Sequence, residues 1–145
     1  IDTVSVESQG HPVVGWLPSP SPDVNRYVIL RSGVTVDTVA ASPFTDLAVS
    51  GSDASYCYAV AAIDSCDNVS DTSAVHCSIR LSALVDKCNR LIQLSWNDNQ
   101  DSVSQGFEVW TAFNGGVPGM LASLSQGISS FVHSQAVPGG HYCYF

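Results

Sequence analysis

A set of aromatic residues and cysteines occurs twice along the chain, in the same order. The repeated sets are Trp16 and Trp96, Tyr27 and Phe107, and the triplets Tyr56-Cys57-Tyr58 and Tyr142-Cys143-Tyr144. The first two pairs lie 80 residues apart and the triplets 86 residues apart. Repetition at a nearly constant offset indicates tandem structural units rather than one larger domain. We therefore expect two units, residues 1–80 and residues 81–145, and we expect the second to be truncated before its last strand.

Short segments of the chain alternate apolar and polar residues, which is the period of a β-strand. The residues predicted to face a core are Pro12, Val14 and Trp16, Tyr27 and Ile29, Ile92, Leu94 and Trp96, and Phe107 and Val109. Clusters of glycine, proline and serine separate these segments and mark turns. Short strands at this spacing predict an all-β fold, and a β-sandwich in particular.

The order of these residues resembles the fibronectin type III family. A tryptophan is followed about eleven residues later by an aromatic residue, and the run Tyr56–Asp64 with the loop Asp67-Asn68-Val69-Ser70 is similar to that family's F strand and F–G loop. The turn Val137-Pro138-Gly139 before Tyr142 resembles the entry to a tyrosine corner. The resemblance implies two tandem fibronectin type III-like (immunoglobulin-like) sandwiches, in which Tyr56 and Tyr142 bury their rings and bond their hydroxyls to backbone. Ordinary core tyrosines of another sandwich are the alternative.

The cysteines suggest a narrower resemblance, because fibronectin type III domains are usually poor in cysteine and this chain has five. A cysteine beside Tyr56, another in the loop Asp-Ser-Cys-Asp-Asn-Val-Ser and a third before Leu-Ser-Trp-Asn resemble repeats that precede the C-terminal sorting domains of Bacteroidetes gliding-motility and surface-adhesin proteins. This resemblance implies a secreted or cell-surface protein that uses type IX secretion.

The cysteine spacing does not match a zinc site, so we expect disulfides formed in an oxidising compartment. Cys57 is predicted to point outward from its strand, and the next strand, about Ser73 to Ile79, carries Cys77. Antiparallel pairing places the two opposite or diagonal to each other, within disulfide reach, so we predict a Cys57–Cys77 bond. Five free buried thiols are the alternative.

The other three cysteines receive no predicted partner within the chain. Cys143 occupies the position of Cys57 in the second copy and would need a cysteine on a following strand. Cys66 falls in the predicted F–G loop and Cys88 near the first strand of the second unit. These places are distant if the units are arranged end to end, so we assign no bond between them.

The composition restricts the classes of partner. The formal net charge is −8 with one lysine, and charged residues are 12% of the chain. Such a surface repels nucleic-acid phosphates and anionic membranes, so we expect neither nucleic-acid binding nor membrane insertion. We expect the partners to be other domains of the same longer chain, or a surface protein or glycan.

No enzymatic or cofactor motif is evident. The sequence contains neither a Gly-x-Ser-x-Gly elbow nor a phosphate-binding glycine loop, and the four histidines show no ligand spacing. We therefore expect no catalytic activity and no cofactor. Two loops are rich in oxygen ligands that calcium could use, one with Asp64, Asp67 and Asp71 and the other with Asp98, Asn99 and Asp101. Solvated loop acids are the ordinary alternative.

Several residues are candidates for modification or binding. Thr3, Thr38 and Ser102 each follow an aspartate and precede a valine, which resembles the O-glycosylation site of exported Bacteroidetes proteins. Asn68 begins a formal N-glycosylation sequon. Trp110 is predicted to point away from the core and could form an aromatic platform for a sugar or protein, or it could pack beneath a loop or neighbouring domain.

Taken together, these features favour a non-enzymatic structural or adhesive module of a secreted or cell-surface protein, acting as a spacer that projects other domains. A protein- or glycan-recognition module with receptor-like paired sandwiches, and an accessory domain of a secreted hydrolase, are the alternatives.

Overall fold

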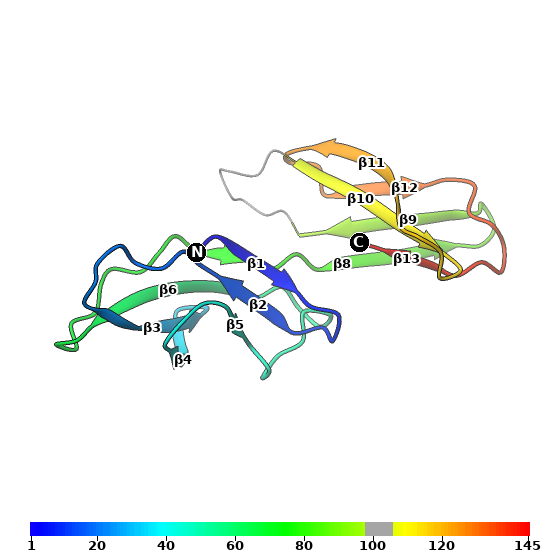
Figure 1. Ribbon diagram of the computed structural model, residues 1–145. Helices are drawn as coiled ribbons and strands as arrows, with labels where there is room; N and C mark the ends of the chain where they lie inside the picture. Colours follow the sequence, from blue (N-terminus) through cyan, green and yellow to red (C-terminus); the bar gives the residue numbers. More distant parts are fainter. Residues whose placement is uncertain (98–105) are drawn as a thin grey trace. The chain divides into compact units, whose positions relative to one another are not determined.

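The computed structural model describes residues 1–97 and 106–145, which form unit one, Ile1–Arg80, and unit two, Leu81–Phe145 (Figure 1). The strands of unit one are β1 (Thr3–Val6), β2 (Pro12–Gly15), β3 (Val24–Arg31), β4 (Val34–Val39), β5 (Phe44–Thr45), β6 (Cys57–Asp64) and β7 (His76–Cys77). Those of unit two are β8 (Leu81–Asp86), β9 (Leu91–Trp96), β10 (Gly106–Phe113), β11 (Gly119–Ser125), β12 (Ser130–His133) and β13 (Tyr142–Tyr144). Within these residues no helix has the length and apolar character required to cross a membrane.

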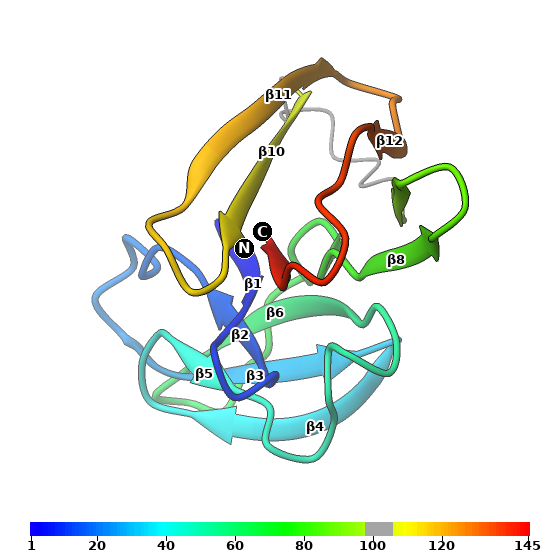
Figure 2. The same cartoon turned by 90° about the vertical axis from the view of Figure 1, so that its right-hand side faces the viewer.

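Unit one is a sandwich of two antiparallel sheets. One sheet has the order β1-β2-β5 and the other β4-β3-β6-β7, and Figure 2 shows β3, β4 and β6 side by side. The core draws residues from both sheets: Val14 and Trp16 from the first sheet and its end, and Tyr27, Ile29, Tyr58 and Val60 from the second. The sheets therefore pack face to face, as the all-β sandwich prediction requires.

Unit two repeats this arrangement. Its sheets have the orders β12-β9-β8 and β11-β10-β13, and its core joins Ile92, Leu94 and Trp96 of β9 with Val109 of β10. In the described residues β13 pairs with β10 alone, whereas its counterpart β6 lies between β3 and β7.

The predicted core faces are confirmed by burial. Val14, Ile29 and Leu94 have no exposed surface, and the other predicted inward residues are buried except Phe107, which is half-buried. The ring centroids of Trp16 and Tyr27 lie 5.3 Å apart, and those of Trp96 and Phe107 lie 5.5 Å apart. Tilted aromatic pairs at this separation stabilise a core beyond the area they bury.

The repeat extends to the strand register. Arg31 of β3 lies opposite Tyr58 of β6, and Thr111 of β10 lies opposite Tyr144 of β13. The two tyrosines close the repeated triplets of the sequence, so the same pair of strands meets in the same register in each unit.

The strand expected around Ser73 to Ile79 is shorter than the sequence pattern indicates. Only His76 and Cys77 form regular strand β7. The chain from Val69 to Ser73 still follows β6, with an isolated bridge between Ile63 and Val69, but serine side chains supply part of its hydrogen bonding. That substitution of side-chain for backbone acceptors interrupts the regular ladder.

Candidate functional site

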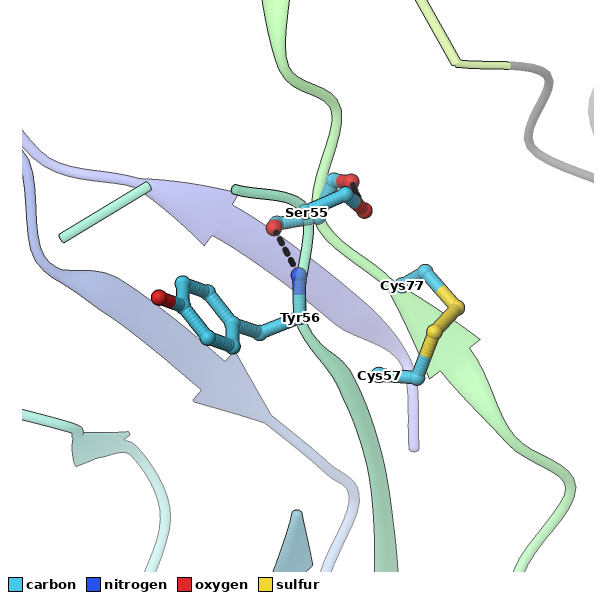
Figure 3. The surroundings of a disulfide bond; sticks show 5 residues. Ser55, Tyr56, Cys57 and Cys77 are labelled. Carbon is cyan, nitrogen blue, oxygen red and sulfur yellow. Dashed lines mark hydrogen bonds between the residues drawn. A yellow bond between two sulfur atoms is a disulfide. The ribbon is translucent and has the colours of Figure 1, made fainter. Parts of the chain in front are cut away.

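A disulfide joins Cys57 and Cys77 across β6 and β7, the pairing that the sequence indicates (Figure 3). The two residues lie directly opposite each other, with a Cα–Cα distance of 3.9 Å. The Cys57 carbonyl accepts a bond from Ser32 on the β3 side, and Ser78 N–H donates to the neighbouring Tyr56 carbonyl on the β7 side. Cys57 and Cys77 are therefore a non-hydrogen-bonded pair, in which opposing side chains approach most closely.

Three serines attach the last segment of unit one to β6 by two bonds each. Ser70, Ser73 and Ser78 donate their backbone N–H to the carbonyls of Ala62 and Val60 in β6 and of Tyr56 just before it. Each serine Oγ accepts the N–H of that same partner residue at 2.9–3.1 Å. We call this two-bond contact a serine clasp. The sequence showed many serines but not this role, because the pairing partners are 8 to 22 residues away.

A polar cluster in unit one joins the buried Tyr58 and Asp46 with the half-buried Arg31. Tyr58 has no exposed surface and donates its hydroxyl proton to Asp46 Oδ2 at 2.9 Å, and the same oxygen accepts a bond from Arg31. Asp46 is 2% exposed. Burial, and then the bond to Asp46, raise the pKa of Tyr58 above its ordinary value of 10.0, and the hydrogen bond with Asp46 raises the pKa of Arg31. The groups satisfy one another, which is the structural role expected of a buried ion pair.

In unit two the expected tyrosine corner is present. The Tyr142 hydroxyl accepts the N–H of Val137 at 2.8 Å, and Tyr142 packs against the core. In unit one the prediction for Tyr56 is wrong. Its ring is half-buried with the Arg31 guanidinium 5.9 Å from the centroid, and among the described residues no backbone bond to its hydroxyl is present. The buried tyrosine of that triplet is Tyr58, whose hydroxyl donates a hydrogen bond to Asp46.

The acidic loop of unit one does not gather its three carboxylates. Asp64 accepts bonds from the backbone of Cys66 and from the backbone and side chain of Asn68, and Asp67 pairs instead with Arg26. The bonds from Asn68 lower the pKa of Asp64. Across residues 1–97 and 106–145 no group of three potential ligands could hold a metal ion, and Asp71 does not join the other two. Asp98, Asn99 and Asp101 lie outside the described residues.

Cys66, Cys88 and Cys143 are exposed free cysteines. Cys66 and Cys88 sit in similar turns: the amides of Cys88 and Asn89 bond to Asp86, as those of Cys66 and Asn68 bond to Asp64. Cys143 lies on β13, opposite Ala112 of β10. The alternative of five free buried thiols is wrong, since one pair is bonded and the others are exposed.

Trp110 lies on the face of β10 that points away from the core, 37% exposed. It pairs with Met120 of β11 on one side and exchanges two backbone bonds with Phe145 on the other. Its indole N–H donates to Glu108 at 3.0 Å. We call Trp110, Met120 and Phe145 the apolar row. The row is exposed and has a carboxylate beside it, an arrangement that suits contact with a sugar or a protein.

The glycosylation candidates have different settings. Thr3 on β1 and Thr38 on β4 are exposed, and the Thr38 N–H bonds to Asp37. Asn68, also exposed, uses its side-chain amide to bond Asp64. Ser102 lies outside the described residues.

A surface hollow of about 260 Å³ in unit one is lined by Trp16, Tyr27 and Ser70 among others. Among residues 1–97 and 106–145, the buried indole N–H of Trp16 has no hydrogen-bond partner, and neither has that of Trp96 in unit two. Because the same orphan donor occurs in both units, it is a property of the repeated core rather than the mark of a ligand site.

The fold defines the chain as a tandem pair of antiparallel β-sandwiches. No family model and no curated protein matches its sequence. Similar solved structures include the central fibronectin-III array of RIM-binding protein, at 14% identity and a TM-score of 0.42 over 99% of this chain and 66% of that chain. The FN1–FN3 domains of chicken CNTN1 match at 15% identity and a TM-score of 0.40, over 99% of this chain and 56% of that chain. The fibronectin(III)-like modules of Clostridium thermocellum CbhA match at 13% identity and a TM-score of 0.38, over 99% of this chain and 84% of that chain. The chain spans 66% and 56% of the first two structures, and with TM-scores below 0.5 the likeness assigns it no ligand or activity.

Proposed function

We propose that this chain is a non-enzymatic structural module of a secreted or cell-surface protein, in which tandem β-sandwiches hold other domains of a longer chain apart. The observation that carries the proposal is the Cys57–Cys77 bond across β6 and β7 of a repeated sandwich. Disulfides persist in oxidising compartments and are rare in reducing ones. A bond between adjacent strands at a sheet edge would keep that edge closed outside the cell.

The chemistry of the described side chains supports a structural role. The buried groups Asp46 and Tyr58 bond to each other, and Asp46 also bonds to the half-buried Arg31, rather than facing a substrate-sized cavity. Glycans on Thr3 and Thr38, which are both exposed, would add protection against proteases in such a setting. The proposal includes neither a cofactor nor a bound metal.

The experiment that tests this proposal compares the chain in its oxidised and reduced forms for resistance to proteases and for ligand binding. A structural module is expected to resist trypsin and thermolysin while oxidised, to lose resistance in unit one on reduction, and to show no saturable binding to glycan arrays. Saturable binding at micromolar concentration would contradict a purely structural role. Free thiols at Cys57 and Cys77 in native material would contradict the proposal of an oxidising compartment.

The apolar row favours a second function, recognition of a protein or glycan. Trp110→Ala removes the centre of the row, and Phe113→Ala is a matched control because Phe113 is 41% exposed on the same strand but contacts Tyr142. Recognition through the row predicts a glycan or protein ligand whose affinity falls at least about tenfold with Trp110→Ala, as for an aromatic hot spot, but not with Phe113→Ala. An accessory role beside a hydrolase would add specific binding to that enzyme's polymeric substrate.

A further inference from the structure

The edge of β6 in unit one shows how this sandwich receives a last strand. The backbone of Tyr56 and Tyr58 points toward β7, where Tyr56 forms its serine clasp with Ser78 and Tyr58 lies opposite His76. Between them, Cys57 faces Cys77 and forms the disulfide. This edge of β6 therefore pairs with a short strand in which a cysteine is followed directly by a serine.

The strand β13 of unit two presents the same edge. On either side of β13, Phe145 exchanges backbone bonds with Trp110, and the His141 carbonyl accepts the N–H of Asn114. Alternate residues along β13 and its flanks therefore turn their backbone groups toward β10. Because hydrogen-bonding direction alternates along an antiparallel strand, the backbone groups of Tyr142 and Tyr144 point to the opposite edge. That edge has no partner strand among the described residues.

Cys143 lies between these two tyrosines, as Cys57 lies between Tyr56 and Tyr58. It is exposed and free. The position of each residue relative to the neighbouring central strand is also the same, since Tyr144 opposes Thr111 as Tyr58 opposes Arg31. An unpaired edge of this kind is a template for an incoming strand.

We propose that the open edge of β13 binds an antiparallel β-strand that carries a Cys-Ser pair, and that Cys143 forms a cross-strand disulfide with that cysteine. The serine clasps Tyr142, and the residue before the cysteine lies opposite Tyr144. The bond forms by thiol–disulfide exchange: the Cys143 thiolate attacks the sulfur of the incoming cysteine, which is supplied as its mixed disulfide with glutathione. The new sulfur–sulfur bond replaces the old one, and glutathione leaves as its thiolate and takes up a proton.

The chain itself supplies a probe for the test. A synthetic peptide with the sequence of residues 73–80, Ser-Ala-Val-His-Cys-Ser-Ile-Arg, reproduces β7 and its flanks. The 145-residue chain is equilibrated with this peptide in a glutathione redox buffer, and the reaction is quenched with acid. Peptide mapping then gives the ratio of peptide adduct to glutathione adduct at Cys143, Cys66 and Cys88 in one sample. Cys66 and Cys88 are internal controls because both are exposed and neither lies in a strand.

The expected ratio at Cys143 exceeds the ratios at Cys66 and Cys88 by at least about fivefold, the effect of one net backbone hydrogen bond. In unit one, the Ser78 amide donates to the carbonyl of Tyr56. A peptide carrying Ser78→Pro lacks this amide, so its adduct ratio at Cys143 should fall to that at Cys66 and Cys88. In the peptide adduct, the amides of Tyr142 and Tyr144 should exchange with solvent more slowly than in the glutathione adduct. Equal ratios at the three cysteines, an unaffected proline peptide or unchanged exchange would each overturn the proposal. A Cys143–Cys143 dimer that excludes the peptide would overturn it too, because the occupant would then be a second copy.

Discussion

Asp46 and His133 occupy equivalent positions in the two units, and each contacts the hydroxyl of the tyrosine that ends the repeated triplet. Asp46 follows Phe44 by two residues and His133 follows Phe131 by two, and these phenylalanines lie opposite Val14 and Leu94 of the equivalent strands β2 and β9. The Tyr58 hydroxyl bonds to Asp46 at 2.9 Å, and the Tyr144 hydroxyl lies 2.7 Å from His133 Nδ1. The repeated fold therefore keeps a partner for this hydroxyl while the partner changes from a carboxylate to an imidazole.

Removal of the Asp46 carboxylate should strongly destabilise unit one. We expect Asp46→Ala to lower the free energy of unfolding by about 3 kcal/mol, because the Tyr58 hydroxyl and the Arg31 guanidinium lose their shared acceptor. Urea denaturation followed by tryptophan fluorescence measures the change. Asp53→Ala, at an exposed aspartate, serves as the control and should leave stability within about 0.5 kcal/mol. Equal effects of the two substitutions would refute the role of the cluster.

Alkaline pH should destabilise the protein through Tyr58, which is buried, and Tyr144, which is half-buried. Burial is the first cause that raises the pKa of both Tyr58 and Tyr144 above the ordinary value of 10.0. Because the folded-state pKa is the higher one, the contribution to stability is complete below pH 10 and is lost as pH rises through the folded pKa. Urea denaturation at intervals above pH 9, with tyrosinate absorbance as the second signal, should show this loss. Tyr58→Phe should reduce the fall in the free energy of unfolding with rising pH. An unchanged dependence on pH would contradict the role of Tyr58.

Acid should act through two exposed turns. The bonds from Asn68 lower the pKa of Asp64, and those from Asn89 lower the pKa of Asp86, each below the ordinary 3.8. A depressed folded pKa gives stability that is present above pH 3.8 and is lost as pH falls through the folded value. Carboxyl titration by NMR should place the pKa values of both Asp64 and Asp86 below 3.8. Asn68→Ala should return the pKa of Asp64 toward its ordinary value and leave that of Asp86 unchanged. A parallel shift of the Asp86 pKa would contradict the claim that each turn acts on its own aspartate.

Loss of the disulfide should loosen unit one. The bond closes a loop with a sequence separation of 20, and removal of a bond that closes a loop of this size costs about 3 kcal/mol in the unfolded-chain entropy model. We expect this change in the free energy of unfolding for the double variant Cys57→Ser, Cys77→Ser. Cys66→Ser is the matched control, since Cys66 is free and exposed. A double variant as stable as the control would show that the bond does not constrain the fold.

The serine clasps should protect individual amides of β6. Ser73→Ala removes the acceptor of the Val60 N–H, and we expect a loss of about 1 kcal/mol with faster hydrogen exchange at Val60. Ser65→Ala changes an exposed serine of the neighbouring loop and should leave that amide protected. Unchanged exchange at Val60 in the Ser73 variant would show that water replaces the hydroxyl without cost.

The strand faces, the disulfide and the repeat could be predicted from the sequence because each depends on a regular pattern of residues along the chain. Alternation of apolar and polar residues placed Val14, Ile29 and Leu94 in the cores, because a strand turns every second side chain to the same face. The predicted Cys57–Cys77 pairing agrees with the bond in the structure because a hairpin with a short loop leaves few possible registers. The repeat itself indicated two sandwiches.

The tertiary structure alone decided which polar groups meet. Asp46 lies 12 residues from Tyr58 in the sequence, and Ser78 lies 22 from Tyr56, so no local period reveals either contact. The same limit explains the incorrect prediction for Tyr56: alternation placed Tyr56 and Tyr58 on one face, but only the folded strands determine which ring reaches the buried carboxylate. Apolar burial is non-directional and can be predicted from pattern, whereas a hydrogen bond requires two groups from distant segments to meet within about 3 Å, which only the completed fold determines.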